Sequence, residues 1–387
     1  MARNSRPTHR RCPRDGSLNS MLLEENKPLA PFTTFGIGGP ARWFVEATNE
    51  DEIVEAAAWA HERGIQLFVL GGGSNLLISD AGFNGLVLRI GLKGISVAEQ
   101  PAEAGHTIYQ AAAGEDWNNC VERTIQDSCA GLECLAGIPG TVGGTPVQNV
   151  GAYGQEVSSS INRVRAYDLQ ARAFVEFTAA ECAFSYRRSR FNSTDRGRFI
   201  VTRVDFRLTP CGAPTLRYAD LQRAFADRLS DAPPPTLVEV AAAVRRVRQS
   251  KGMLLIEGDS DCRSAGSFFK NPLVTEDQLS RIAAAVAQTP PRFPAGPKAE
   301  PGLVKIPAAW LIEQAGFSKG YKLGAAAISS KHTLALVNAG ISSKIGSPAA
   351  RRTATAEEIL SLARQITDAV EAKFHIRLQM EPVLLGF

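Results

Sequence analysis

Two glycine-rich stretches contain the residue types best suited to binding a phosphorylated ligand. The longer one, residues 131–154, has seven glycines and two prolines, and its one charged side chain is Glu133. Glycine allows φ > 0 and lets main-chain N–H groups come close to a ligand, and such groups bind phosphates. The stretch therefore favours an extended cofactor with a central pyrophosphate. A structurally demanding turn region fits the same composition.

The second stretch, Gly-Gly-Gly-Ser-Asn-Leu-Leu at 71–77, directly follows the apolar run 66–70. It contains neither GxGxxG nor GxxxxGK[ST], so a dinucleotide fold with that fingerprint and a P-loop ATPase are not supported. The N–H groups of residues 72–75 and the hydroxyl of Ser74 could still bind a phosphate at the carboxyl end of a strand, where α/β sheets place ligands. A plain β-turn is the alternative.

Polar side chains elsewhere add candidates for chemistry, each with a structural alternative. Residues 184–191 combine aromatic residues with arginines, which could also be a solvated turn with extended arginine stems. Residues 245–251 carry four cations that could bind a diphosphate or stabilise a helix C-terminus. Residues 266–272 alternate as in a strand, with Ser267, Phe269 and Asn271 on one face. Glu381 lies in the last predicted strand, as a surface charge or as a buried functional group.

The elements that must position these residues follow from periodicity. A strand at 42–47, a helix that begins after Thr48 or Asn49 and ends at Gly64, and a strand at 66–70 form a predicted β-α-β unit. Further strands are predicted at 86–90, 107–112, 161–168, 173–177, 199–208, 334–338 and 377–385, and helices at 115–128, 236–249, 306–315 and 355–374. Residues 288–302 are predicted to be a surface loop, and Pro233–Pro235 to mark a domain boundary.

Length and composition narrow the class of protein. A chain of 387 residues predicts two or three domains. The net charge of +4 equals the excess of five arginines over one aspartate in residues 1–20, so the rest of the chain offers no electrostatic footprint for nucleic acid. We expect residues 1–20 to be disordered. Either Met21 is the natural start of the protein or this tail is dispensable.

Cysteine and histidine usage excludes other classes of site. The seven cysteines form no CxxC pair, which is typical of reduced thiols in a cytoplasmic protein. The five histidines lie outside the glycine-rich stretches, so neither histidine catalysis nor a metal site is expected. The chain has no apolar run long enough to span a membrane, and residues 1–20 lack the apolar core of a secretory signal.

Seven short motifs in sequence order resemble the UDP-N-acetylenolpyruvoylglucosamine reductase family. They are TTFGIGGPA (33–41), GGGSNLL (71–77), AGIPGTVGGTPVQNVGAYGQE (136–156), YRRSRF (186–191), GSFFKNP (266–272), AAWLIEQAG (308–316) and LQMEPVLLG (378–386). The resemblance implies an α+β protein. Its FAD-binding domain would be of the vanillyl-alcohol oxidase (PCMH) type, with two α/β subdomains over residues 21–232 joined by a C-terminal strand at 377–387. A smaller α+β substrate domain would span residues 233–376.

The resemblance also implies an activity. Non-covalent FAD would be reduced by NADPH and would reduce UDP-N-acetylenolpyruvoylglucosamine to UDP-N-acetylmuramate for peptidoglycan synthesis. The family's catalytic residues fall on Arg187, Ser267 and Glu381. Arg187 would offer a bidentate fork to a carboxylate. Glu381 would assist if protonated or hydrogen-bonded, and Ser267 would deliver a proton to carbon with help from neighbours such as Lys270 or a water chain.

Binding residues follow in the same way. The cofactor would contact Gly71, Gly72, Gly73, Ser74 and Asn75, together with Ile138, Thr141, Gly143, Gln148, Asn149 and Ala152. The substrate would contact Tyr218, Lys251 and Asn271. No metal, nucleic-acid, membrane or obligate protein partner is expected.

Two alternatives stay open at this point. Another flavoprotein with the same cofactor fold, such as a hydroxy-acid or alcohol oxidase, would share the glycine-rich stretches but has no reason to carry Ser267 and Glu381 in these contexts. A nucleotide-binding regulatory protein without catalysis would bind no flavin. Segments 253–263, 288–302 and 340–354 are longer than is usual in the family, so the chain departs from the family pattern in the loops of its substrate domain.

Overall fold

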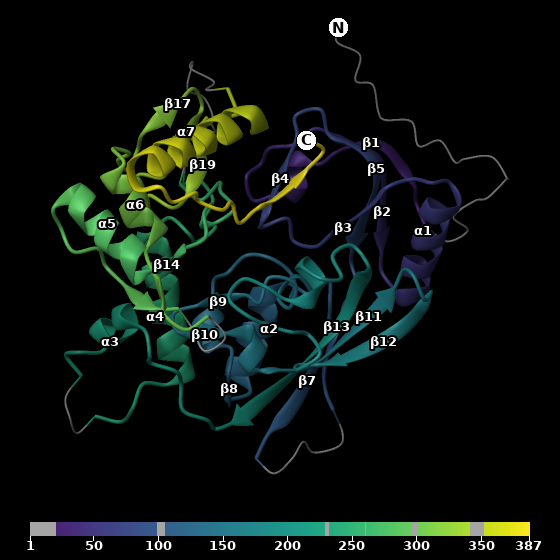
Figure 1. Ribbon diagram of the computed structural model, residues 1–387. Helices are drawn as coiled ribbons and strands as arrows, with labels where there is room; N and C mark the ends of the chain where they lie inside the picture. The colour runs from purple at the N-terminus through teal and green to yellow at the C-terminus, as the bar shows by residue number, and fades with distance from the viewer. Residues whose placement is uncertain (1–20, 99–104, 229–231, 260, 296–299, 341–351) are drawn as a thin grey trace, which may run out of the picture.

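The computed structural model describes residues 21–98, 105–228, 232–259, 261–295, 300–340 and 352–387. The predicted disordered tail at 1–20 and most of segment 340–354 lie outside these residues. The chain forms two neighbouring units, and its C-terminal segment returns from the second unit to the first (Figure 1). None of the helices described there has the length and apolar character needed to cross a membrane.

The first unit begins with a four-stranded sheet in the order β1-β2-β5-β3. Its strands are β1 (Glu24–Pro28), β2 (Pro40–Ala47), β5 (Phe83–Ile90) and β3 (Leu67–Leu70), and both β2 and β3 run parallel to β5. Helix α1 (Glu50–Glu62) begins at Asn49, whose side chain accepts a hydrogen bond from the N–H of Glu52 at 3.0 Å. The predicted β-α-β unit is confirmed, and the loop at 71–75 leaves the carboxyl end of β3.

A second sheet of the same unit is antiparallel, with the order β12-β11-β13-β7-β6 and β8 paired with β13. Its strands are β6 (Ile95–Val97), β7 (Thr107–Ala112), β8 (Cys129–Ala130), β11 (Ile161–Asp168), β12 (Ala173–Thr178) and β13 (Phe199–Pro210). Helix α2 (Trp117–Gln126) packs against it through Trp117, which lies 5.8 Å from Phe206 between ring centres. One apolar core joins both sheets of this unit.

The second unit has its own apolar core. Helices α5 (Glu276–Val286), α6 (Ala308–Gln314) and α7 (Ala356–Phe374) surround two small sheets. The sheets are β14 (Leu273–Thr275), β16 (Leu303–Lys305) and β15 (Phe293–Pro294), and β17 (Lys322–Leu323), β18 (Ala326–Ile328) and β19 (Leu336–Asn338). Residues 288–302, predicted to be a loop, therefore include strand β15.

Helices α3 (Ala219–Ala224) and α4 (Leu237–Ser250) connect the two units. Five side chains of α4, including Val240 and Val244, belong to the core of the first unit. The domain boundary at residue 233 remains a prediction.

The C-terminal segment differs from the predicted strand 377–385. Only β20 (Val383–Leu385) is a strand, and it pairs in parallel with β4 (Leu76–Ile78). The predicted strand at 266–272 is wrong, because the structure assigns no strand to these residues. An isolated bridge joins Phe269 to Met380 instead.

Candidate active site

The two glycine-rich loops lie face to face at the carboxyl end of β3. A Cβ atom on Gly72 would lie 2.5 Å from the Cα atom of Gly140, and one on Gly71 would lie 2.8 Å from Oγ1 of Thr141. Gly73 has φ +60°, and a Cβ there would lie 1.8 Å from the carbonyl oxygen of Phe32. Glycine is required at residues 72 and 73 because the backbones are in contact there.

A cavity of about 510 Å³ opens beside this contact. Gly71, Gly72, Gly140 and Thr141 form part of its wall, and charged side chains such as Arg89 line it further out. Cavities of this size are typical of cofactor sites. The Oγ1 atom of Thr141 is buried and has no hydrogen-bond partner among the described residues. A buried hydroxyl without a partner is costly, so this wall fits a ligand with a polar group.

The first turn of α2 fixes the loop at 137–141. The amide nitrogen of Asn118 donates to the carbonyl oxygen of Ile138 at 3.0 Å, and its oxygen accepts from the N–H of Gly137 at 2.6 Å. The N–H of Trp117 donates to the carbonyl oxygen of Gly140 at 3.1 Å. The wall of the cavity is thus held by hydrogen bonds within the protein.

Several predicted cofactor residues have structural partners. Gly143 donates its N–H to the carbonyl oxygen of Ala113 at 2.8 Å. Asn75 donates from its side-chain amide to the carbonyl oxygen of Glu381 at 3.2 Å, so it holds the C-terminal segment in place. Ser74 lies against Gly140, because a Cβ atom on Gly140 would be 2.9 Å from the Oγ atom of Ser74.

The remaining predicted cofactor residues lie on residues 148–152. Asn149 is fully buried, and its side-chain amide donates to the carboxylate of Glu156 at 3.0 Å and to the carbonyl oxygen of Ser185 at 2.9 Å. Gln148 is half-buried. Ala152 belongs to β9 (Gly151–Ala152), which pairs with β10 (Gln155–Glu156).

Arg187 and Glu381, far apart in sequence, are in contact. Their Nε and Oε1 atoms are 2.9 Å apart, and the side chains are 21% and 14% exposed. The Nε hydrogen is not aligned with this oxygen, so Nε has no hydrogen bond among the described residues. A terminal nitrogen of Arg187 donates to the carbonyl oxygen of Gly151 at 2.9 Å. Arg187 has φ +53°, a backbone conformation that is uncommon outside glycine and concentrated at functional sites.

Ser267 lies on the segment next to Glu381. The N–H of Glu381 donates to the carbonyl oxygen of Phe268 at 2.9 Å, and the N–H of Lys270 donates to that of Gln379 at 2.9 Å. Half-buried Ser267 is therefore one residue from the direct backbone partner of Glu381. The structure brings the three predicted catalytic residues to one region, and their roles remain predictions.

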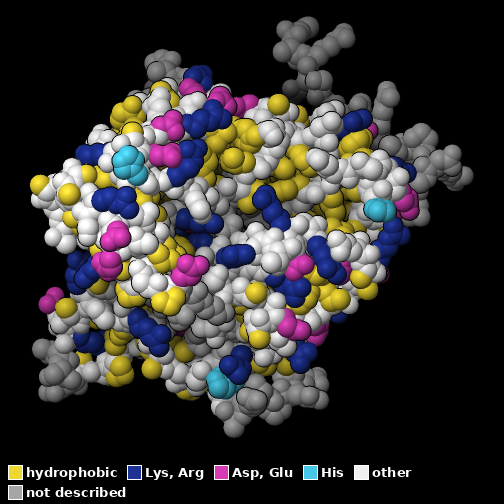
Figure 2. Space-filling view, in the orientation of Figure 1, with side chains coloured by type: hydrophobic (Ala, Val, Ile, Leu, Met, Phe, Trp, Pro, Cys, Tyr) yellow, Lys and Arg dark blue, Asp and Glu magenta, His cyan; other side chains and the backbone are white. Residues whose placement is uncertain are grey.

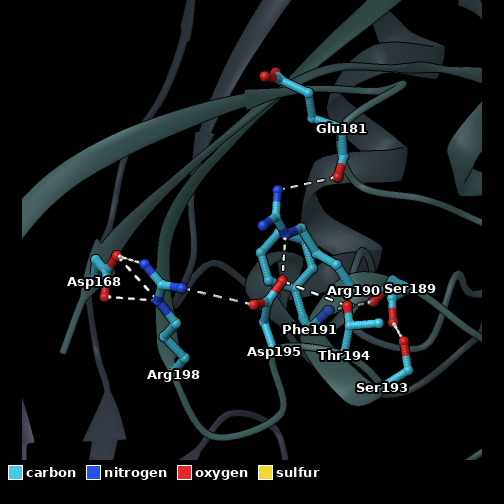
Figure 3. Close-up of polar contacts among 9 residues, drawn as sticks. All are labelled: Asp168, Glu181, Ser189, Arg190, Phe191, Ser193, Thr194, Asp195 and Arg198. Carbon is cyan, nitrogen blue, oxygen red and sulfur yellow. Dashed lines mark hydrogen bonds and ion pairs between the residues drawn. The ribbon is translucent and has the colours of Figure 1, made fainter. Parts of the chain in front are cut away.

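A polar network holds the segment at 189–198, which follows the turn that carries Arg187 (Figure 3). The Ser189 hydroxyl donates to the carbonyl oxygen of Val147 at 2.7 Å, which ties this segment to the longer glycine-rich loop. Arg190 donates to Asp195 at 2.8 Å, and Arg198 donates to Asp168 at 2.6 Å. The hydrogen bond from Arg198 lowers the pKa of Asp168 to about 2.

The predicted substrate residues fall into two groups. Tyr218 packs edge-to-face on Tyr153 with ring centres 5.3 Å apart, and Nζ of Lys251 lies 5.7 Å from the Tyr218 ring centre. Burial opposes the charge on Lys251, but its 2.7 Å hydrogen bond to Asp220 and nearby negative groups raise its pKa. The structure therefore brings Tyr218 and Lys251 together.

Asn271 has different partners. Its side-chain oxygen accepts from the N–H of Ala308 at the start of α6, at 2.9 Å. Asn271 also interacts with Tyr186, whose pKa is raised by burial. This places Asn271 beside the turn that carries Arg187.

Sequence reasoning missed the basic residue Lys305 near these loops, and it named Arg248 only as one of four cations that could bind a diphosphate or stabilise a helix C-terminus. Arg248 is buried, and it donates to the carbonyl oxygens of Gly137 at 2.9 Å and Met253 at 2.7 Å. Burial lowers its pKa. Its helical spacing from the apolar residues Val240 and Val244 was the available signal. Lys305 follows a predicted loop, and no sequence pattern pointed to it.

Comparison with known proteins relates the chain to one enzyme family. Residues 41–171 match the family model described as FAD binding domain, and residues 258–385 match UDP-N-acetylenolpyruvoylglucosamine reductase, C-terminal domain. A protein of Streptomyces coelicolor named UDP-N-acetylenolpyruvoylglucosamine reductase is 45% identical over 93% of this chain and 89% of its own. One of the same name from Thermobifida fusca is 42% identical over 93% and 97%. The crystal structure of the reductase from Thermus caldophilus covers 95% of this chain and 100% of its own, with a TM-score of 0.61 and 25% identity.

Proposed function

Because the chain belongs to the UDP-N-acetylenolpyruvoylglucosamine reductase family, we infer that it reduces UDP-N-acetylenolpyruvoylglucosamine to UDP-N-acetylmuramate. FAD is its cofactor, and NADPH is the hydride donor. The product is a precursor of peptidoglycan. The observation that carries the proposal for the active site is the contact between Arg187 and Glu381, with Ser267 on the neighbouring segment.

The residues of the first unit fit the cofactor. The close contact of Gly72 with Gly140 leaves a backbone surface on which N–H groups would hold the pyrophosphate. The buried hydroxyl of Thr141 would bind a polar group of FAD. When bound, FAD supplies hydride transfer between NADPH and the enolpyruvyl double bond.

Arg187 would bind the carboxylate of the substrate. Addition of hydride to the terminal carbon of the enol ether leaves negative charge on the carbon next to this carboxylate. The planar guanidinium can donate two hydrogen bonds to a carboxylate and stabilise the charge as it develops. Its remaining bonds to Gly151 and its contact with Glu381 would fix its orientation.

Ser267 would donate the proton that completes the reaction at this carbon. A positioned general acid typically contributes 10²- to 10⁴-fold to the rate. Glu381 would hold Arg187 and, when protonated, would donate a hydrogen bond to the substrate carboxylate. Tyr218 and Lys251 would bind the diphosphate of the substrate. Asn271 would contact the substrate near the turn that carries Arg187. We further propose a cytoplasmic location, because NADPH and the nucleotide sugar are cytoplasmic metabolites.

The function is tested by mixing FAD-loaded protein with NADPH and the enolpyruvyl nucleotide. We expect NADPH oxidation that depends on the nucleotide and yields UDP-N-acetylmuramate. Arg187→Met should lower the turnover of the nucleotide by at least ~10²-fold, the effect of removing one donor that stabilises a developing negative charge. Arg188→Met is the matched control, because Arg188 is the exposed neighbour in the same turn.

Other outcomes would contradict this function. Oxygen consumption with hydroxy acids or alcohols, without reduction of the nucleotide, would identify an oxidase. A purified protein that binds nucleotide but no flavin would identify a binding protein. Equal loss of activity in the Arg187→Met and Arg188→Met variants would remove Arg187 from the proposed site.

A further inference from the structure

Lys305 places a positive charge beside Arg187. It is the last residue of β16, where its backbone faces Leu273, two positions after Asn271. Its Nζ atom lies 4.8 Å from the centre of the Tyr186 ring, and the guanidinium carbon of Arg187 lies 5.5 Å from the same centre. Two cationic side chains therefore lie near the ring of Tyr186, in the turn that contacts Glu381.

The tyrosine near both cations has contacts of its own. Tyr186 interacts with Asn271, and Asn271 accepts from the N–H of Ala308 at 2.9 Å. These contacts connect the turn that carries Arg187 to α6 of the second unit. Lys305 is thus positioned by contact with the aromatic face, which attracts an ammonium group.

Lys305 differs from Arg187 and Lys251 in its charge balance. Arg187 contacts Glu381 at 2.9 Å and Lys251 contacts Asp220 at 2.7 Å, whereas Lys305 forms no ion pair with any residue that the structure describes. Lys305 is half-buried, and burial lowers its pKa, opposed by Glu156 and reinforced by Arg187.

Glu156, the acidic residue that raises the pKa of Lys305, does not form an ion pair with it. Glu156 is not within ion-pair distance, and its Oε2 atom accepts from the side-chain amide of Asn149 at 3.0 Å. A half-buried ammonium without a counter-ion is costly, and the cost is recovered when an anion binds next to it. Several Lys and Arg side chains are visible where the two units meet (Figure 2), so this region is suited to an anionic ligand.

We propose that Lys305 binds an anionic group of the nucleotide substrate, as a second cation beside Arg187. The inference rests on the proposed function and extends it to a residue outside the predicted trio. The substrate has two anionic groups, the carboxylate and the diphosphate. Both present oxygen atoms to an ammonium donor in the same way.

The test measures nucleotide binding to the FAD-loaded protein by calorimetry. The probes are UDP-N-acetylmuramate, which carries both anionic groups, and UDP-N-acetylglucosamine, which carries only the diphosphate. Lys305→Met should weaken binding of UDP-N-acetylmuramate on the order of 10- to 100-fold, the effect of losing a charge-assisted hydrogen bond. Lys305→Arg should stay within a few-fold of the wild type because it keeps the charge.

The two probes identify the anion. If Lys305 binds the carboxylate, binding of UDP-N-acetylglucosamine to Lys305→Met is unchanged. If it binds the diphosphate, both nucleotides lose affinity equally. Either result supports the proposal. Unchanged binding of both nucleotides to Lys305→Met and Lys305→Gln would overturn it.

Controls separate this inference from the proposed function. Lys322→Met removes an exposed lysine from β17 of the same unit and should leave both affinities unchanged. Retained FAD content and an unchanged melting midpoint show that a variant is folded. A wild-type protein that binds neither nucleotide would overturn the proposed function and this inference together, whereas equal binding by wild type and variants overturns only the role of Lys305.

Discussion

Replacement of Thr141 by valine should change cofactor affinity and apoprotein stability in opposite directions. Oγ1 of Thr141 is buried without a hydrogen-bond partner among the described residues and lies in the wall of the cavity. Valine has nearly the same shape and lacks the hydroxyl. Because a buried hydroxyl without a partner costs about 1–3 kcal/mol, the FAD-free variant should be more stable by about 1 kcal/mol.

The affinity for FAD should fall in the same variant. Loss of the hydrogen bond to FAD, with a cofactor group left unpaired, costs about 1–3 kcal/mol, which corresponds to roughly 5- to 150-fold in Kd. Stability is measured by denaturant unfolding of the FAD-free protein, and affinity by quenching of flavin fluorescence. Thr145→Val is the control, since this buried hydroxyl already donates to the carbonyl oxygen of Val142 at 2.8 Å.

The control variant Thr145→Val should lose stability and keep its affinity for FAD. Thr145→Val should lower the stability of the FAD-free protein by about 0.5–1.5 kcal/mol and leave FAD binding unchanged. The reasoning about Thr141 is refuted if Thr141→Val lowers apoprotein stability and binds FAD as well as the wild type does. That result would show that water satisfies the hydroxyl and that the cofactor does not touch it.

Three further variants test other parts of the account. Gly72→Ala should abolish FAD retention, read from the absorbance of the purified protein, because its Cβ would lie 2.5 Å from Cα of Gly140; a fully yellow variant would contradict this close contact. Asp168→Asn should lower the free energy of unfolding at neutral pH by about 1.5–3 kcal/mol through loss of the bond from Arg198. Because the folded pKa of Asp168 is about 2 and its ordinary value is 3.8, the stabilisation is complete above about pH 5 and is lost as the pH falls toward 2; a gap between wild type and variant that stays constant from pH 5 to pH 3 would rule this out. Lys251→Met should weaken binding of UDP-N-acetylglucosamine on the order of tenfold in calorimetry, and unchanged affinity would remove it from the diphosphate site.

Local signals predicted the elements of the first unit well. Asn49 begins α1 with three acidic residues in its first turn, and apolar residues recur at helical spacing, so caps and periodicity agree. The strands at 107–112 and 161–168 were predicted with the observed bounds because each is a short apolar run between turn residues.

Where the predicted elements were wrong, tertiary contacts determine the local structure. The alternation in residues 266–272 indicates a strand, but Phe268 and Phe269 both enter the core of the second unit. Their neighbour, the C-terminal segment, forms only one bridge with them before β20 moves to β4. Such a switch of partners leaves no periodic trace in the sequence.

The site shows the same limit. Motifs of the glycine-rich loops predicted a cofactor wall, but the need for glycine at residue 72 comes from Gly140, 68 positions later, and only the fold reveals that contact. Asn75 was predicted to touch the cofactor, while its side chain holds the backbone of Glu381. The position of Lys305 depends on packing between distant segments, so local reasoning could not assign it, whereas the helical spacing of Arg248 from Val240 and Val244 was a local signal for its burial.

The most direct test of the central claim is a single-turnover experiment on Ser267→Ala. The FAD-loaded variant is first reduced by NADPH without oxygen and is then mixed with the enolpyruvyl nucleotide, while the flavin absorbance is followed. The account predicts reduction by NADPH at nearly the wild-type rate and reoxidation by the nucleotide that is ~10²- to 10⁴-fold slower. Equal slowing of both half-reactions, or reoxidation at the wild-type rate, would contradict the role of Ser267 as proton donor beside Arg187 and Glu381.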